Sequence, residues 1–467
     1  MSETKPLVQS SDDAENLRKL KAYQPMAFAI TFGGYLMAHF SRKSYSTCKN
    51  QLETEAGFSP LLLSSMDTVF MATYAVGNVI NGKLGDTMNP TTVLAVGLFG
   101  SGFCLLLINS LIWFDVENQF EKLGAILILI FYGLFGFAQA TGGPVGTAVM
   151  GNWFCDKESE KKRGIIFGLW TCHQYVGDVM AQFVSAAIFA SGTQYWYCLL
   201  IPSIANVLWG FVTAQLVADP VSKGIVTPEL KIRQAKLAAK KAEAEEAGKD
   251  SSGIVDEGAK AISFVGAFQI PMVAQYAVAF GFFKLCNYAF FFWLPYFLSH
   301  TNFSDTEANM IAAAYSFGMM PGGIIVGVVS DMLGGRRAVV IGIFMVILMG
   351  FLAVFAKFSE QLSSGAFVGM LFVMGTLVGG PNNIITSAVA ADLSAHPSVR
   401  GSSKSLGTVT GIINGTGSLV SAVGLLFIGP LQAHYGWGSV WIYMFCCTGI
   451  GTLLMSTKIY AEVKTMF

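Results

Sequence analysis

Two apolar stretches of the sequence carry positive charges among residues that suit a lipid environment. The stretch over 270–298, IPMVAQYAVAFGFFKLCNYAFFFWLPYFL, has Lys284 at its midpoint as its only charge. A second stretch, near 24–47, carries the pair Arg42-Lys43. A charge near the middle of a bilayer costs roughly 2.5–3.5 kcal/mol, and such residues usually face a cavity, a partner or a substrate. The chemistry that these cations suggest is the binding of an anion.

Two or three cations, with few acids in the apolar stretches, favour a doubly charged anion such as a phosphate monoester. The fork of Arg42 can bind phosphate oxygens in pairs, whereas Lys43 and Lys284 act as movable point charges. His173 could donate to a phosphate and would titrate near neutrality. The remaining candidates for the substrate site are three tyrosines that could offer hydroxyls to a sugar and a lysine that could act as an entry cation: Tyr45, Tyr74, Tyr288 and Lys404.

Each candidate also has a structural interpretation. Arg42 lies eighteen residues after Gln24, about 27 Å along a helix, so hydropathy alone would place it at the far surface with its charge snorkelling. Lys284 could instead form an ion pair with Asp67 or Asp178. We expect water to reach Asp67 at the far end of its span, whereas Asp178 lies deeper and could alternatively couple transport to protons.

The other candidates have equally simple alternatives. A lone buried histidine such as His173 often only packs and forms hydrogen bonds, and tyrosines at helical spacing often belong to the packed core. Lys404 could be an ordinary charge on the cytosolic side. These alternatives stay open on the sequence alone.

Composition places the chain in a membrane. Apolar residues make up 53% and charged residues 12%, against about 25% charged residues in a soluble domain. The 51 glycines and 37 phenylalanines suit close helix packing in lipid. The net charge of zero gives no reason to expect nucleic acid, and the eight scattered cysteines form neither a disulfide framework nor a metal pattern.

Apolar windows predict an all-α integral membrane protein with twelve transmembrane helices in two six-helix halves. We expect an N-terminal tail (1–23), a first half (24–217), a polar linker (218–262), a second half (263–460) and a C-terminal tail (461–467). The expected spans lie near 24–47, 65–83, 91–112, 124–150, 163–190, 195–217, 268–298, 308–330, 338–357, 365–390, 404–430 and 438–460.

Basic residues predict the orientation of these spans. Lysines and arginines gather in the N-terminal tail, the fourth connection, the linker and the eighth connection, whereas the opposite side offers only Lys49, Lys122 and Lys357. The positive-inside rule therefore places both termini and the linker in the cytosol. The glycosylation sequon Asn302-Phe303-Ser304 then falls on the far side.

The two halves look like repeats. Asp86 ends a GKLGD segment after the second span, and Asp331 ends a GVVSD segment after the eighth, 245 positions later. Arg163-Gly164 and Arg400-Gly401 each follow a proline of a glycine-rich run by 19 positions. Such duplication is typical of secondary transporters, whose site lies between the halves. Adding the same interval to Arg42 gives position 287, within one helical turn of Lys284.

The sequence contains no catalytic constellation. The patterns G-x-S-x-G, H-E-x-x-H and G-x-x-x-x-G-K-[ST] are all missing. We therefore expect neither an enzyme nor a cofactor.

The connections after Asp86 and Asp331 resemble the signature loop of the major facilitator superfamily. The second copy keeps Arg336 and Arg337, and the first lacks the usual arginines. Several segments, taken together, are similar to the organophosphate:phosphate antiporters, and most of all to the eukaryotic sugar-phosphate exchangers related to the endoplasmic-reticulum glucose-6-phosphate transporter: FSRK at 40–43, GNWF at 151–154, KRG at 162–164, WLP at 293–295, ADL at 391–393 and the run over 400–418.

The resemblance implies the exchange of a phosphorylated sugar or glycerol phosphate for inorganic phosphate in the endoplasmic reticulum membrane. It implies that Arg42 and Lys43 line the site, that Lys284 replaces the seventh-span cation and that Lys404 lies near the site. Bacterial members place the seventh-span cation nearer the tryptophan that matches Trp293, and their fifth-span histidine one place later, at Gln174. Asp178 and Asn414 depart from the family pattern as well.

Overall fold

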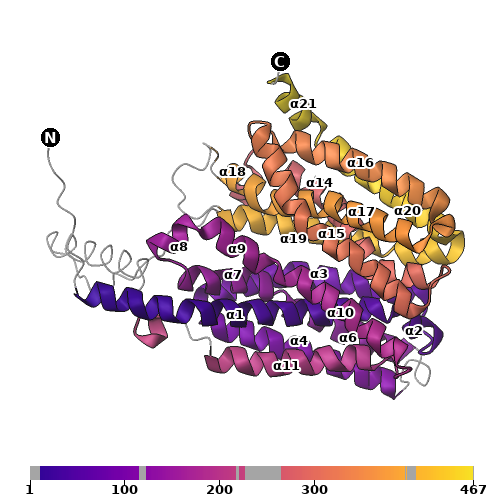
Figure 1. Cartoon of the computed structure of the whole chain (residues 1–467), viewed down its shortest axis with the longest axis horizontal. Helices are drawn as coiled ribbons and strands as arrows, with labels where there is room; N and C mark the ends of the chain where they lie inside the picture. Colours follow the sequence, from indigo (N-terminus) through magenta and orange to yellow (C-terminus); the bar gives the residue numbers. More distant parts are fainter. Residues whose placement is uncertain are drawn as a thin grey trace.

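The computed structural model describes residues 11–114, 122–216, 220–226, 264–394, 396 and 406–465. These residues form helices joined by short connections (Figure 1). The first half contains α1 (Ser11–Thr47), α2 (Lys49–Thr54), α3 (Pro60–Thr87), α4 (Pro90–Trp113), α6 (Lys122–Gln139), α7 (Gly142–Trp153), α8 (Lys157–Lys161), α9 (Arg163–Thr171), α10 (His173–Ala190), α11 (Tyr197–Leu216) and the short η1 (Pro220–Lys223).

The second half follows the same order after the linker. It contains α13 (Phe264–Phe268), α14 (Val273–Ser299), α15 (Asp305–Met332), α16 (Arg337–Phe358), η2 (Ser359–Gln361), α17 (Ser364–Ile384), the π-helical η3 (Ile385–Val389), α18 (Ala390–Ser394), α19 (Leu406–Leu425), α20 (Ile428–Leu454) and α21 (Ser456–Lys464).

Nine helical segments of the described residues are long and apolar enough to cross a membrane. They are α4, α6–α7, α11, α14, α15, α16, α17–α18, α19 and α20. The remaining three of the twelve predicted spans correspond to α1, α3 and α9–α10. These helices are less apolar because they carry charged residues inside the protein, among them Arg42, Asp67 and Asp178.

The helix ends differ from the apolar windows at both ends of the chain. α1 begins at Ser11, well before the first predicted span, because its early turns are polar and invisible to hydropathy. α20 begins at Ile428, whereas the sequence predicted a span from 438. Gly436 explains this difference, since its φ of +74° is left-handed and interrupts the helix just before residue 438.

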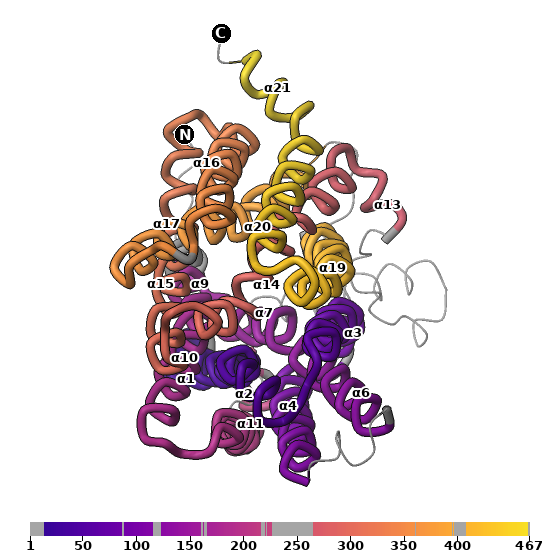
Figure 2. Tube along the Cα trace, turned by 90° about the vertical axis from the view of Figure 1, so that its right-hand side faces the viewer, coloured from indigo at the N-terminus to yellow at the C-terminus, as the bar shows by residue number. Residues whose placement is uncertain are grey.

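The helices form two groups that correspond to the two halves, one indigo to magenta and the other orange to yellow in Figure 2. Between the groups, α3 packs against α19, α10 against α15, and α1 against α14. The second helix of each half thus meets the fifth helix of the other. This reciprocal pairing is what a two-fold relation between duplicated halves requires, and it places α1 and α14 at the centre of the interface.

Glycines allow the closest helix contact within the second half. A Cβ atom on Gly318 of α15 would lie 2.0 Å from the carbonyl oxygen of Phe372, and one on Gly375 of α17 would lie 2.2 Å from that of Tyr315. Small residues let helix backbones approach closely, which is how membrane helices gain packing energy without a hydrophobic driving force.

We expect Gly375→Ala to lower the free energy of unfolding by about 1–3 kcal/mol, because the added methyl group forces two backbones apart. Gly369→Ala is the matched control, since a Cβ atom on Gly369 in the same helix would meet nothing within 4 Å. Thermal unfolding in detergent would compare the two variants. Equal unfolding midpoints would mean that α15 and α17 are not in tight contact.

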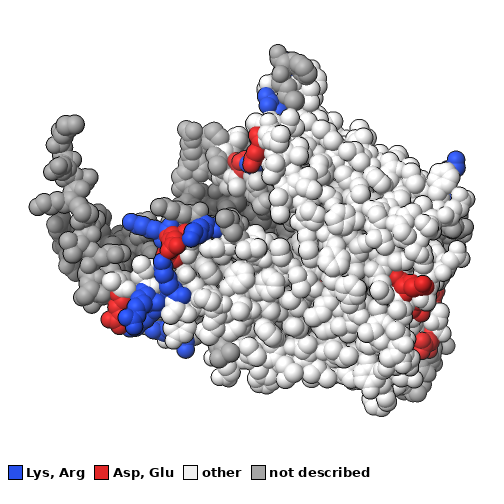
Figure 3. All heavy atoms as spheres, viewed as in Figure 1, with Lys and Arg blue, Asp and Glu red and all other residues white. Residues whose placement is uncertain are grey.

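Charged side chains lie mainly near the helix ends, and a broad uncharged belt separates them on the face that Figure 3 shows. At the end where α8 lies, Lys21 of α1 pairs with Glu158 at 2.5 Å, and Lys162 pairs with the same carboxylate at 3.1 Å. The hydrogen bonds from Lys21 and Lys162 hold the pKa of Glu158 below its usual range. The contact of Lys21 with Glu158 holds the first turns of α1 against α8.

Candidate functional site

Lys284 of α14 is buried and has no carboxylate partner among the described residues. Its side chain is 4% exposed. Its Nζ atom donates to Oδ1 of Asn414 at 2.6 Å and to Oγ of Ser418 at 2.7 Å, both on α19. Within the described part of the chain, no ion pair includes Lys284. Its charge is therefore solvated by neutral dipoles and remains available to an anion.

The two carboxylates that the sequence offered as partners for Lys284 bind elsewhere. Asp67 of α3 pairs with Lys49 at 2.8 Å, and both side chains are fully buried. Asp178 of α10 pairs with His39 of α1 at 3.1 Å. The alternative interpretation, a structural ion pair between Lys284 and one of these two carboxylates, is therefore not what the described residues show.

Two expectations about exposure are also wrong. Asp67 is out of reach of water, and Lys49 is not a surface charge of the far side. The Nζ atom of Lys49 lies 3.8 Å from the ring centroid of Trp293 as well. The ion pair and the aromatic ring together compensate a lysine that hydropathy assigned to the surface.

Arg42 of α1 is also buried, with 1% of its surface exposed. Its Nε atom donates to Oε1 of Gln139 at 3.1 Å, and its guanidinium lies 4.7 Å from the ring centroid of Tyr74. Its Nη2 atom is buried without a hydrogen-bond partner among the described residues. Arg42 thus does not reach the surface, as snorkelling would require, and it keeps donor capacity for a ligand.

Tyr288 lies near both cations. The Nζ atom of Lys284 is 5.7 Å from the Tyr288 ring centroid. Arg42 lies close enough to Tyr288, Tyr74, Tyr35 and Lys284 to interact with each of them electrostatically. One cation from each half and at least two of the predicted tyrosines therefore share one neighbourhood at the interface of the halves.

Lys43, the neighbour of Arg42, has a different environment. Its Nζ atom donates to the backbone carbonyl of Phe291 on α14 and lies 4.5 Å from the centroid of the Phe291 ring. Its side chain is 2% exposed. In this conformation Lys43 connects the two halves directly.

The structure places the other candidates as follows. Tyr45 donates its hydroxyl to the carbonyl of Leu63 at 3.0 Å and packs on Tyr132, which is the packing role that the sequence left open. His173 is 1% exposed, and neither ring nitrogen has a hydrogen-bond partner in the described structure. It lies edge-on to aromatic rings of the first half, among them Tyr35 at 4.2 Å. Lys404 lies outside the described residues.

The loop candidates lie at the end of the helices where α8 and α18 are found. Gly334 and Gly335 have φ values of +68° and +80°, which lets the chain turn sharply after Asp331. Arg337 then contacts both the carboxylate of Asp392 and the carbonyl of Ala388, and Arg336 donates to the carbonyl of Thr465 at 2.8 Å. Asp86 belongs to the last turn of α3, and its side chain lies outside the described structure.

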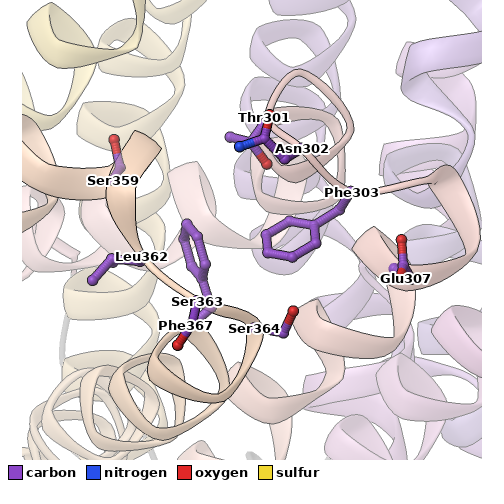
Figure 4. A pocket seen from close by; sticks show the side chains of 9 residues that line it. All are labelled: Thr301, Asn302, Phe303, Glu307, Ser359, Leu362, Ser363, Ser364 and Phe367. Carbon is purple, nitrogen blue, oxygen red and sulfur yellow. The ribbon is translucent and has the colours of Figure 1, made fainter.

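A pocket of about 320 Å³ lies between the α14–α15 and α16–α17 connections. Figure 4 shows Asn302 of the sequon and Glu307 among its lining residues, and none of the predicted site residues lines it. Ser304 of the sequon caps α15. Its Oγ atom accepts from the N–H of Glu307 at 3.3 Å, and the carboxylate of Glu307 accepts from the N–H of Ser304. The serine thus has a structural role of its own.

Several polar partners of the cations were missed by sequence reasoning. They are Gln139, Ser418 and the carbonyl of Phe291, while Asn414 was noted only as a departure. The sequence carried a signal for Ser418 and for the carbonyl of Phe291. Asn414 and Ser418 are four residues apart, so they share one face of α19. Pro295 follows Phe291 by four residues and predicts that the Phe291 carbonyl lacks its helical partner.

Residues 31–425 match the Major Facilitator Superfamily. The chain belongs to this family. It is 32% identical over 488 residues to "Sugar phosphate exchanger 3" of Xenopus laevis, covering 94% of this chain and 92% of that protein. It is 31% identical over 478 residues to "Putative glycerol-3-phosphate transporter 1" of Arabidopsis thaliana, covering 95% and 89%.

As a member of the major facilitator superfamily, the chain is a multi-pass membrane transporter, and the predictions of the fold class and of a non-enzymatic protein are confirmed. A solved D-xylose-proton symporter has a TM-score of 0.65 at 14% identity, covering 92% of this chain and 96% of the symporter. At such low identity this likeness concerns the fold alone.

Proposed function

We propose that this protein exchanges a phosphorylated sugar or glycerol phosphate, such as glucose-6-phosphate, for inorganic phosphate by alternating access. The observation that carries the proposal is the pair of buried cations Arg42 and Lys284, one from each half, with neutral partners. A phosphate dianion between them would receive charge-assisted hydrogen bonds from both. The names of the relatives support the same class of substrate.

The arrangement of the halves gives the proposed cycle a physical basis. Hydrogen bonds join the halves at the end where α2 lies: Oγ of Ser46 donates to the carbonyl of Phe291 at 2.7 Å, and Nδ2 of Asn50 to Asp305 at 2.9 Å. This end is closed. In the proposal the site exchanges substrate through the opposite end, and the halves then rock about the cations.

An empty carrier would reorient slowly under this scheme, because uncompensated buried charges oppose closure of the site. Bound phosphate or sugar phosphate removes that penalty, so the carrier reorients loaded. Strict exchange follows from the neutral partners of Lys284 rather than from an additional coupling device.

The orientation and the membrane are part of the proposal. Basic residues favour cytosolic termini and a cytosolic linker, so the closed end would face away from the cytosol. The likeness to sugar-phosphate exchangers supports the endoplasmic reticulum membrane.

Counterflow in proteoliposomes tests the proposal. Vesicles loaded with unlabelled phosphate should accumulate labelled phosphate against its gradient, and a panel of phosphate esters should compete with it. Phosphorylated sugars and glycerol phosphate should compete, and the parent alcohols should not. A protein that senses or scaffolds without transport would give no counterflow.

A second candidate is proton-coupled transport of an organic anion. The buried pair of His39 and Asp178 favours it, since both groups can take up a proton. His39 lies on the same helix as Arg42, and Asp178 is its partner on α10. Accumulation of labelled substrate driven by a pH gradient alone, without phosphate inside, would select this candidate over exchange.

A further inference from the structure

Two carboxylates from opposite halves line one pocket at the end of the molecule where α2 lies, the α2 end. The pocket has a volume of about 280 Å³, and its walls include Glu55 after α2, Asp305 at the start of α15 and the α10–α11 connection over 192–195. Figure 3 shows acidic side chains gathered at this end. The pocket therefore lies where the two halves meet and has a negative lining.

The two carboxylates act on each other. Partial burial, and then the charge of Asp305, raise the pKa of Glu55. Neither Glu55 nor Asp305 forms an ion pair with another described residue. Two like charges thus lie close together at the interface of the halves, and no described lysine, arginine or histidine compensates them.

A buried amide of α2 lines the same pocket. Gln51 is 5% exposed, and its Oε1 atom has no hydrogen-bond partner among the described residues. Buried polar atoms are normally hydrogen-bonded or bound to a ligand, because leaving one unpaired costs free energy. Gln51 therefore indicates a ligand at this place independently of the two acidic side chains.

The groups around the pocket offer oxygen atoms, which are the ligands of a hard cation. Calcium accepts carboxylate, amide, main-chain and water oxygens in a flexible geometry, whereas magnesium demands a near-ideal octahedron and gives up its water reluctantly. The described residues contain no group of three His, Cys, Asp or Glu side chains suited to a metal ion. The chemistry therefore disfavours zinc and favours calcium held in part by amide, main-chain and water oxygens.

We propose that Glu55, Asp305 and the amide of Gln51 bind a calcium ion that joins the two halves at the α2 end. Nδ2 of Asn50 donates to Oδ1 of Asp305 at 2.9 Å and so orients that carboxylate. Glu55 and Gln51 belong to the first half and Asp305 to the second, so the ion bridges the interface. It removes the repulsion between the carboxylates and stabilises the closed end. The calcium site does not depend on the proposed substrate, and it adds a regulation of exchange from the side that the α2 end faces.

Calorimetric titration of the full-length protein with calcium tests the site. The protein is held in nanodiscs of a zwitterionic lipid, which contributes few calcium sites of its own. We expect one ion per protein with a dissociation constant of about 0.1–1 mM, the range of calcium sites in extracellular modules. Magnesium should bind at least about tenfold more weakly.

Two substitutions each remove one charged ligand and keep the shape of the side chain. We expect Glu55→Gln and Asp305→Asn each to weaken calcium binding at least about tenfold, because the affinity of such sites follows the number of charged ligands. Glu53→Gln is the matched control. It removes the same charge from α2, but the carboxylate of Glu53 contacts Tyr296 and His300 and does not line the pocket. Its calcium affinity should stay within about threefold of that of the unsubstituted protein.

Spin labels at positions 61 and 302 report whether calcium holds the halves together. Both positions are exposed at the α2 end, one in each half. The labels are introduced as non-canonical amino acids, so that the eight native cysteines remain. Calcium at about ten times its dissociation constant should raise the ratio of short to long distances about tenfold, if it binds the closed end alone. Glu53→Gln should show the same response, and Glu55→Gln should show none.

Each outcome bears on a separate part of the inference. A lack of saturable calcium binding, or equal affinity in Glu55→Gln, Asp305→Asn and Glu53→Gln, would overturn the site. Equal affinity for magnesium would overturn the assignment to calcium. Distances that do not respond to bound calcium would overturn its bridging role. Phosphate counterflow, measured without calcium, separates the two proposals: if counterflow is absent while calcium binds, only the proposed exchange is overturned, and if counterflow is intact while calcium does not bind, only the calcium site is.

Discussion

Replacing Lys284 by methionine should reduce phosphate counterflow at least about a hundredfold. Removing one partner of a buried charged contact costs about 3–5 kcal/mol, and each 1.4 kcal/mol corresponds to about tenfold in affinity. In the proposed site, Lys284 is the only cation that the second half contributes from the described residues beside Arg42. Initial rates of labelled phosphate uptake into proteoliposomes measure the effect.

The same substitution should leave the protein folded. Methionine is apolar and of similar length, and Ser418 keeps its bond to the carbonyl of Asn414 at 2.9 Å. Thermal unfolding should therefore show an unchanged or raised midpoint, because a buried unpaired charge has been removed. Lys357→Met is the control for charge, since Lys357 is exposed at the end of α16. Full counterflow in Lys284→Met would remove α14 from the substrate site.

A carboxylate placed next to Lys284 should have a comparable effect without removing the lysine. Asn414→Asp puts a charge at the Oδ1 position, 2.6 Å from the Nζ atom of Lys284. The resulting internal ion pair neutralises the cation and repels an incoming phosphate. Two charges about 4 Å apart interact by about 4 kcal/mol at an intermediate dielectric, so we expect a loss of phosphate affinity of roughly several hundredfold.

Asn414→Ala separates charge from shape. It removes the amide but adds no charge. The phosphate affinity of Asn414→Ala should therefore be about tenfold higher than that of Asn414→Asp. Phosphate affinity is obtained from the concentration dependence of counterflow. If both variants bind phosphate equally well, the charge of Lys284 does not attract the anion, and the electrostatic basis of the proposed site is wrong.

The sequence identified the main cations of the proposed site because a charge in a long apolar stretch is conspicuous. Lys284 and Arg42 were both identified in this way, and the interval between the repeats predicted that they would lie near each other. The prediction failed where one apolar stretch had to be placed against another. Asp67 and Asp178 were plausible partners of Lys284 by depth alone, yet each is bound within its own half, to Lys49 and His39.

Hydropathy also misjudged Lys49. Its position shortly after the first span suggested a surface charge, because a hydropathy window carries no information on the contact between Lys49 and Trp293 of α14. The ion pair and the aromatic contact that compensate Lys49 come from two other helices. Contacts of this kind depend on how several helices pack together. The residue types and spacing within one helix do not predict them.

Composition, periodicity and repeated landmarks by themselves determined that this chain is a duplicated bundle of membrane helices with cations inside it. They did so because lipid excludes unsatisfied polar groups and leaves few folds for an apolar chain of this length. Only the tertiary structure decided which cations are neutralised. Compensation of a charge requires a partner within a few ångströms, and the partners of Lys284, Lys49 and Lys43 all come from other helices, brought near by packing.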